Sequence, residues 1–170
     1  MNLKDKIRVI SDFPEKGISF KDITTLLQDG EAFSHTINLF VDELKDLDFD
    51  LIVGPESRGF IFGTPLAYAT HKGFIPVRKP GKLPAETIRY EYKLEYGSDS
   101  LEIHKDSIKP GQKVIIVDDL LATGGTIKST IKLVEQLGAE IVGLFFLIEL
   151  TYLDGRESLK QYYIKSLIQY

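Results

Sequence analysis

One run of the sequence combines an apolar segment, two adjacent carboxylates and a turn of small and hydroxyl residues. From residue 114 to residue 126 it reads VIIVDDLLATGGT. A buried strand that runs into Asp118 and Asp119 would place both carboxylates at the edge of a sheet, where they can accept hydrogen bonds from a sugar diol or help to hold a divalent cation. We expect this run to bind a ligand that carries both a diol and a phosphate.

The turn that follows the strand suits an anion. A helix that begins near Thr126 exposes unpaired N–H groups and the positive end of its dipole. Gly124 and Gly125 allow the backbone to approach a ligand closely, and Thr123 and Thr126 add hydroxyl donors, so the turn predicts a nest for a phosphate monoester. A plain strand-to-helix turn with Thr126 as N-cap is the alternative. Neither a Walker A loop nor a G-x-G-x-x-G fingerprint is present, which excludes both of those nucleotide motifs.

Length and composition are those of one globular domain. The chain has 170 residues, 43% hydrophobic and 27% charged, with a net charge of -4, and it is long enough to bury a core. Its charges are interspersed, so nothing indicates a nucleic-acid partner. The N-terminus becomes charged before any apolar run, and the longest apolar run, residues 141–148, is too short to span a bilayer. The absence of cysteine excludes disulfides and thiolate chemistry, and we expect a cytoplasmic protein with no membrane partner.

Apolar periodicity predicts the elements that position these residues. Continuous apolar runs predict buried parallel strands at residues 51–53, 114–117 and 141–148, with a shorter candidate at 74–77. Helical spacing occurs over residues 32–44, 59–70 and 126–137, and Gly138 is a plausible C-cap for the last helix. This alternation predicts an α/β domain with a parallel sheet. Residues 83–101 carry repeated Glu, Tyr and Ser together with a Lys and a Gly, and they predict a long loop or a protruding hairpin.

The strand with its two Asp residues and Ala-Thr-Gly-Gly-Thr resembles the phosphoribosyl pyrophosphate (PRPP) motif of the type I phosphoribosyltransferases. From about residue 12 onwards the chain also resembles the adenine phosphoribosyltransferases, through several segments in the same order. These are DFP at 12–14, GISFKDI at 17–23, ESRGF at 56–60, PVRKPGKLP at 76–84 and LEYG at 94–97. The resemblance implies a single phosphoribosyltransferase domain over residues 1–170, with a mostly parallel twisted sheet flanked by helices. It also implies a hood at about 12–30, a lid at about 83–101 and the PRPP motif at 114–126.

The resemblance implies roles for the residues of the first run and of the lid. Asp118 and Asp119 would face the ribose hydroxyls and, with Glu95 as a candidate acid or base near the purine, form the catalytic set. The 5′-phosphate would be held by Ala122, Thr123, Gly124, Gly125 and Thr126.

Two further segments, together with Tyr96 of the lid, are implied to contact the diphosphate. Its binding residues would be Glu56, Ser57, Arg58, Arg78, Lys79, Lys82 and Tyr96. A non-proline cis peptide is expected near Glu56-Ser57. Arg58 stands at the start of the expected helix, a poor electrostatic position for a cation, so a ligand anion explains it better. The family's basic residues in the second segment reach the diphosphate partly across a dimer interface, which implies a homodimer.

The base would be bound by the N-terminal segment. Phe20 would stack on adenine, a contact worth roughly 1–3 kcal/mol, while the backbones of Ser19 and Arg58 would meet the edge of the base. Without the resemblance, packing of the phenyl ring in the core is the favoured interpretation of Phe20.

The implied activity is purine salvage, in which adenine and PRPP give AMP and diphosphate. Adenine N9 attacks ribose C1 as the diphosphate leaves, and Mg²⁺ is the expected cofactor. The ion would be held mainly by PRPP and water, so no protein ligand is assigned to it. Two alternatives stay open: a phosphoribosyltransferase for another base, and a non-catalytic regulator that senses PRPP.

Overall fold

The structure, a computed structural model, describes residues 1–93 and 96–170. Internal contacts divide the chain into two compact units, Met1–Glu43 and Leu44–Tyr170. None of the helices in the described residues is long and apolar enough to cross a membrane.

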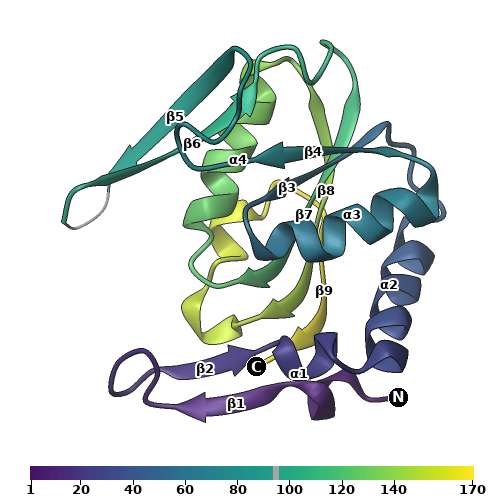
Figure 1. Cartoon of the computed structure of the whole chain (residues 1–170), viewed down its shortest axis with the longest axis vertical. Coiled ribbons are helices and arrows are strands. Elements are labelled where there is room, and N and C mark those ends of the chain that lie inside the picture. The colour runs from purple at the N-terminus through teal and green to yellow at the C-terminus, as the bar shows by residue number, and fades with distance from the viewer. Residues whose placement is uncertain (94–95) are drawn as a thin grey trace. The chain divides into compact units, whose positions relative to one another are not determined.

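The first unit is a hairpin followed by helices (Figure 1). A short 3-10 helix, η1 (Leu3–Lys6), precedes the antiparallel strands β1 (Arg8–Ser11) and β2 (Ser19–Asp22), and α1 (Thr24–Leu27) and α2 (Gly30–Leu44) follow, the last residue of α2 belonging to the second unit. Asp22 fastens the hairpin to α1, because its carboxylate accepts hydrogen bonds from Arg8 Nε at 2.9 Å and from the Thr24 N–H at 2.9 Å. The connection between the strands contains a cis Phe13-Pro14 bond, and the rings of Phe13 and Phe20 meet edge to face with centroids 5.2 Å apart.

The second unit is built on a five-stranded parallel sheet in the order β4-β3-β7-β8-β9. In chain order its elements are β3 (Leu51–Pro55), α3 (Arg58–Thr70), β4 (Gly73–Val77), β5 (Thr87–Lys93), β6 (Ser98–His104), β7 (Lys113–Leu121), α4 (Gly125–Gln136), β8 (Glu140–Glu149), the 3-10 helices η2 (Thr151–Leu153) and η3 (Glu157–Leu159), and β9 (Ile164–Gln169). The expected α/β architecture with a parallel sheet is confirmed. The segment that broke the pattern forms the antiparallel hairpin β5–β6.

β3 and β7 are neighbours in the sheet, but the chain leaves them in opposite directions. α3 leads from β3 to β4, and α4 leads from β7 to β8. Because parallel crossovers are right-handed, the two helices cover opposite faces of the sheet. The strand order therefore reverses between β3 and β7, and in open α/β sheets the carboxyl ends of two such strands flank the usual ligand crevice.

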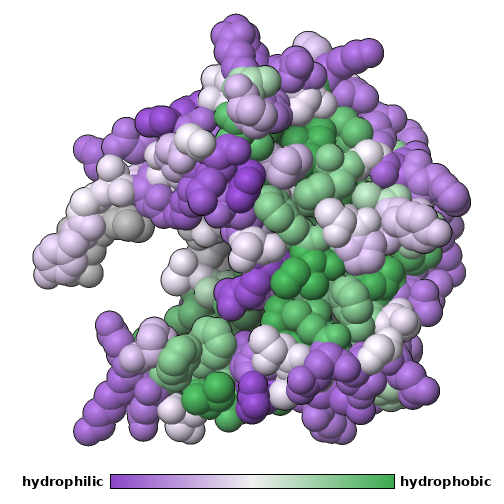
Figure 2. All heavy atoms as spheres, viewed as in Figure 1, coloured by the Kyte–Doolittle hydropathy of each residue, from purple (hydrophilic) through white to green (hydrophobic). Residues whose placement is uncertain are grey.

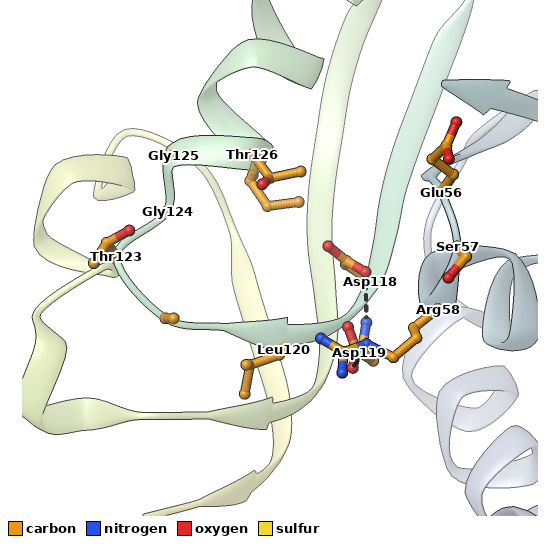
Figure 3. A pocket seen from close by; sticks show the side chains of 12 residues that line it. Glu56, Ser57, Arg58, Asp118, Asp119, Leu120, Thr123, Gly124, Gly125 and Thr126 are labelled. Atoms are coloured by element: carbon orange, nitrogen blue, oxygen red, sulfur yellow. Dashed lines mark hydrogen bonds and ion pairs between the residues drawn. The ribbon is translucent and has the colours of Figure 1, made fainter. Parts of the chain in front are cut away.

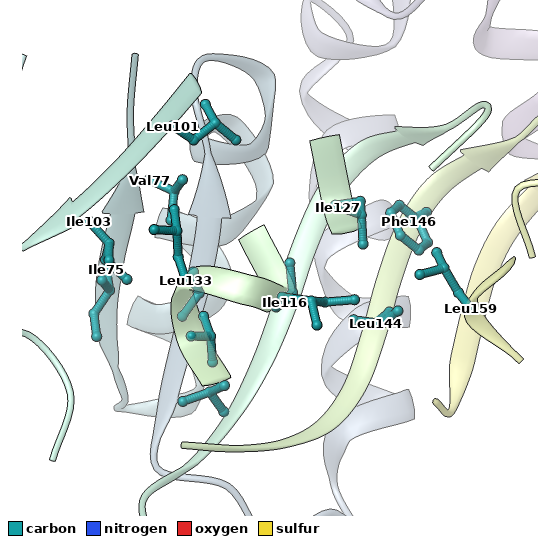
Figure 4. Packing of buried hydrophobic residues seen from close by; sticks show 14 of the residues in the cluster. Ile75, Val77, Leu101, Ile103, Ile116, Ile127, Leu133, Leu144, Phe146 and Leu159 are labelled. Atoms are coloured by element: carbon teal, nitrogen blue, oxygen red, sulfur yellow. The ribbon is translucent and has the colours of Figure 1, made fainter. Parts of the chain in front are cut away.

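The face of the sheet under α4 carries a continuous apolar cluster (Figure 4). Ile127 and Leu133 of α4 pack in this cluster with Ile116, Leu144 and Phe146 of β7 and β8, and all five side chains are buried. Alternate strand residues share one face, so the intervening positions face α3, which contacts β3, β4 and β7. Burial on both faces explains why these strands appear in the sequence as unbroken apolar runs.

Two boundaries differ from the sequence expectation. β7 does not end at residue 117 but continues to Leu121, because its backbone stays paired with β8 through Leu120↔Ile148 and Leu121↔Glu149. The last helix begins at Gly125, and its N-cap is Gly124 in the left-handed region (φ 89°) rather than Thr126. Strands β1, β2 and β9 were not predicted; they are short and partly exposed, so their apolar pattern is weak.

Candidate active site

A pocket of about 230 Å³ opens at the carboxyl ends of β3 and β7, where the strand order reverses (Figure 3). Three segments line it: the loop after β3 with the start of α3, the end of β7, and the turn into α4. The lining residues are Glu56, Ser57, Arg58, Asp118, Asp119, Leu120, Ala122, Thr123, Gly124, Gly125, Thr126 and Ile127. Ten of them were singled out from the sequence. Leu120 and Ile127 were not singled out. For Leu120 a signal was present, because strand alternation places it on the same face as Asp118.

The two carboxylates lie inside β7 rather than after it. Asp118 pairs with Phe146 of β8, and Asp118 and Asp119 are only 9% and 5% exposed. The Asp119 N–H donates a hydrogen bond to Asp118 Oδ1 at 2.9 Å. Because neighbouring strand residues point to opposite faces, the paired backbone holds the two carboxylates in fixed and different directions.

One cation of the pocket is paired with one of these carboxylates. Arg58 Nε lies 2.9 Å from Asp119 Oδ2, which gives this helix-start Arg an anion within the protein. Burial, followed by the charge of Asp119, raises the pKa of Asp118 well above its ordinary value. Burial also raises the pKa of Asp119, although Arg58 opposes the shift. The site therefore holds two crowded carboxylates whose ionised forms would be favoured by hydroxyl donors or further positive charge.

The turn from β7 to α4 presents backbone N–H groups to the pocket. Gly124 adopts φ 89°, a conformation in which a side chain is strained. The first turn of α4 leaves its N–H groups without partners inside the helix, and the helix dipole adds partial positive charge there. Figure 3 shows Thr123, Gly124, Gly125 and Thr126 on one side of the pocket, opposite Ser57 and Arg58. This arrangement can hold an anion.

The loop after β3 forms the opposite wall, and it contains the expected cis peptide bond between Glu56 and Ser57. The Glu56 N–H donates to the Val77 carbonyl at 2.8 Å, and Glu56 Oε1 accepts from the Lys79 N–H at 2.7 Å. Arg78 Nε lies 3.3 Å from the same oxygen. Glu56 therefore joins the loop after β3 to the basic segment after β4.

The basic side chains of that segment do not line the pocket. Lys79 Nζ forms an ion pair with Asp99 of β6, and Asp99 also accepts a hydrogen bond from the Tyr92 hydroxyl at 3.0 Å. Burial and the Asp99 hydrogen bond raise the pKa of Tyr92 to about 12. Lys82 is exposed. Asp99 and Tyr92 were not recognised from the sequence, because nothing local marks them as partners of Lys79.

The remaining residues singled out from the sequence lie elsewhere. Ser19 and Phe20 belong to β2 of the first unit. Tyr96 is 88% exposed between β5 and β6, and Glu95 lies outside the described residues. Within the described part of the chain, no group of three or more His, Cys, Asp or Glu residues is arranged to hold a metal ion.

Comparison with known proteins assigns this arrangement to a family. Residues 22–168 match the phosphoribosyl transferase domain. The chain is 66% identical over 170 residues to an adenine phosphoribosyltransferase from Clostridium tetani, covering 100% of this chain and 99% of that protein.

Solved structures agree with this match. The crystal structure of adenine phosphoribosyltransferase from Thermoanaerobacter pseudethanolicus superposes with a TM-score of 0.95 at 60% identity, covering 99% of this chain and 98% of that one. The Saccharomyces cerevisiae enzyme, complexed with an imino-altritol bisphosphate and adenine, superposes with a TM-score of 0.91 at 42% identity, covering 97% of this chain and 96% of that one. The chain therefore belongs to the phosphoribosyltransferase family, and within it to the adenine phosphoribosyltransferases.

Proposed function

We propose that this adenine phosphoribosyltransferase makes AMP and diphosphate from adenine and PRPP at the pocket between β3 and β7. One observation carries the assignment of the site. The two buried carboxylates, the anion-binding turn and the loop with the cis peptide converge on one pocket where the strand order reverses.

The ribose 5-phosphate half of the substrate is assigned to β7 and the turn that follows it. The phosphate is held by N–H groups and hydroxyls of residues 122–126, which lie at a helix N-terminus. Asp118 and Asp119 accept hydrogen bonds from the ribose hydroxyls. Hydroxyl donors would favour the ionised forms of both carboxyl groups and so offset the burial that raises their pKa values.

The diphosphate half is assigned to the loop after β3 and to the basic segment after β4. Glu56, Ser57 and Arg58 line the pocket, and Arg78, Lys79, Lys82 and Tyr96 complete the proposed set. Lys79 would exchange Asp99 for the diphosphate, and a Lys can make this exchange easily because its ammonium group is a point charge on a flexible stem.

Mg²⁺ is the proposed cofactor, carried into the site on the diphosphate oxygens. The carboxylates of Asp118 and Asp119, which line the pocket, would suit the waters of an ion that is held mainly by PRPP and takes few protein ligands. When bound, the ion neutralises charge on the leaving diphosphate.

Adenine is assigned to Phe20, which stacks on the ring, and to the backbones of Ser19 and Arg58. In the reaction N9 forms a bond to ribose C1 while the bond from C1 to the diphosphate breaks, and Glu95 takes the purine proton. Positive charge develops on the ribose as the diphosphate departs, and the two Asp carboxylates favour it. Positioning and charge neutralisation supply most of the rate, since little covalent help from the protein is needed.

The β5–β6 hairpin is the proposed lid over PRPP. Figure 2 shows mainly hydrophilic residues over this hairpin, as expected for a lid that is exposed to solvent when it is open. Closure would exclude water from the site and limit hydrolysis of PRPP.

A homodimer is proposed through α3. Figure 2 shows hydrophobic residues gathered over this helix, where Tyr68 is 86% exposed. A patch of exposed apolar surface of this kind is typical of an interface. Sedimentation of the native chain and of Tyr68→Asp tests the proposal: a native chain that sediments as a monomer contradicts it.

The activity is tested by incubating the protein with PRPP, Mg²⁺ and, separately, adenine, hypoxanthine, guanine, xanthine or a pyrimidine, and following nucleotide formation. We expect AMP from adenine, loss of activity on chelation and recovery when Mg²⁺ is restored. Activity on another base without AMP formation from adenine would overturn the assignment of the substrate.

A further inference from the structure

Outside the pocket, a buried carboxylate at the end of β8 is paired with a half-buried Arg. Glu149 is 3% exposed, and its carboxylate accepts hydrogen bonds from Arg156 Nε at 2.8 Å and from Arg156 Nη2 at 2.5 Å. Arg156 also donates to the Ile164 carbonyl and to Ser166 Oγ, both at 3.2 Å. This one guanidinium therefore fastens the segment of residues 151–160 to both β8 and β9.

The fastened segment lies against the phosphate turn. Glu149 pairs with Leu121, the last residue of β7, and the Leu150 N–H donates to the Leu121 carbonyl at 2.9 Å. Gly155, next to Arg156, is buried so closely against the turn that an added Cβ would overlap the Ala122 carbonyl oxygen. In Figure 3 the yellow-green ribbon of this region passes behind Thr123 and Gly124.

We infer that Arg156, Glu149 and Gly155 are positioning residues for the 5′-phosphate: they hold residues 122–126 in the shape that binds it. The inference rests on the proposed assignment of those residues to the phosphate. An anion nest works only when its N–H groups converge, yet the turn contains two adjacent glycines, which are the least restrained residues in a chain. The shape must therefore be imposed from outside the turn, and the segment of residues 151–160 contacts it from behind.

Four variants separate the parts of this arrangement. Arg156→Met removes the guanidinium group, and Arg156→Lys keeps the positive charge without the bidentate geometry. Glu149→Gln keeps the shape of the side chain without its negative charge. Gly155→Ala leaves the ion pair intact and displaces the Ala122 carbonyl. Because Gly155 does not have a positive φ, this last substitution acts through space alone.

Two control variants match them. Lys160→Met breaks the exposed pair Lys160–Glu157 in the same segment. Ile108→Val removes one buried methyl group just before β7, at the amino end of this strand, whereas the pocket lies at its carboxyl end. This variant shows how much a loss of stability alone changes ligand binding.

The measurement is calorimetric binding of ribose 5-phosphate and, separately, of magnesium diphosphate, at a temperature where circular dichroism shows every variant folded. We expect Arg156→Met, Glu149→Gln and Gly155→Ala to raise the Kd for ribose 5-phosphate by about five-fold or more, the equivalent of one lost hydrogen bond. Arg156→Lys should be affected less, and the Kd for diphosphate should not change. In steady-state assays the KM for PRPP should rise and the KM for adenine should not.

Wild-type affinity for ribose 5-phosphate in Arg156→Met and Gly155→Ala would overturn the inference, as would a loss for both ligands that merely follows stability, as gauged by Ile108→Val. A parallel variant, Thr126→Val, tests the underlying assignment. If it binds ribose 5-phosphate as the wild type does, the phosphate site itself is wrongly placed. If it binds weakly while Arg156→Met binds normally, only the positioning role fails.

Discussion

Asp118→Asn should lower catalysis and raise stability in the same protein. Asp118 is 9% exposed and lies inside β7, directly after its buried apolar residues, while Arg58, which lines the pocket, pairs with Asp119 instead. Asn has the same size, and its Oδ1 can still accept the hydrogen bond from the Asp119 N–H. The substitution therefore removes a charge with little change in packing.

The catalytic loss follows from the proposed contact with a ribose hydroxyl. A hydrogen bond to a charged acceptor contributes about 1.5–3 kcal/mol, so loss of the charge should lower kcat/KM for PRPP by roughly 10- to 150-fold. If the contact also strengthens as positive charge develops on the ribose, kcat should fall as well as KM rise.

The gain in stability follows from the raised pKa. Between the unfolded and the folded pKa of Asp118, the folded protein binds more protons than the unfolded one, so its stability falls as pH rises through that window. Above the folded pKa the free-energy cost of burying the ionised Asp118 carboxylate is fully present, and the uncharged Asn removes this cost. The stability difference between Asp118→Asn and the wild type should therefore grow from acid pH upward and then level off.

Urea denaturation over a pH series and steady-state kinetics at one pH measure the two effects. Asp119→Asn is the matched control, because it removes the charge that pairs with Arg58 and should therefore stabilise less or destabilise. A variant that is less stable than the wild type at neutral pH would refute the electrostatic argument. An unchanged kcat/KM would refute the contact with the ribose.

Three further results are expected. Asp99→Asn frees Lys79 from a partly exposed ion pair and should tighten diphosphate binding by about two- to five-fold, measured by calorimetry; equal or weaker binding argues against the exchange. Asp22 has its pKa lowered to about 2, chiefly by hydrogen bonds from Thr24, so its contribution to stability is present above its unfolded value of 3.8 and is lost as pH falls through about 2. The melting temperatures of Asp22→Asn and the wild type should converge as the pH falls from 3.8 to about 2. A difference in melting temperature that does not change with pH would contradict this link between ionisation and stability. Glu102→Gln weakens three hydrogen bonds to a buried carboxylate and should cost about 1.5–3 kcal/mol in urea denaturation; a smaller loss would mean that the neutral amide serves as well.

The central strands and their helices could be predicted from the sequence because their signals are local. Residues 51–53, 114–117 and 141–148 lie in β3, β7 and β8, the three inner strands of the sheet, and cover on both faces requires the unbroken apolar runs by which they were found. Residues 74–77 of the edge strand β4 form a shorter run, in which Ile75 and Val77 are buried. The other edge strand, β9, is fully buried only at Ile164 and Ile168 and carries polar residues between and after them, so its sequence lacks such a run. The phosphate turn was recognisable for a similar reason: its glycines and hydroxyls act through the backbone within a few residues of one another.

What only the tertiary structure decided are contacts between residues far apart in the sequence. Asp118 and Asp119 follow an apolar run in the sequence, but pairing with β8 extends β7 past them, and both carboxylates line the pocket. Arg58 reaches Asp119, Lys79 reaches Asp99, and Gly155 lies against Ala122. None of these pairs has a local signature, since each depends on which strand ends the sheet brings together. The sequence alone therefore determined the kind of ligand, and the packing around the sheet decided which charges are paired and what holds the phosphate turn in shape.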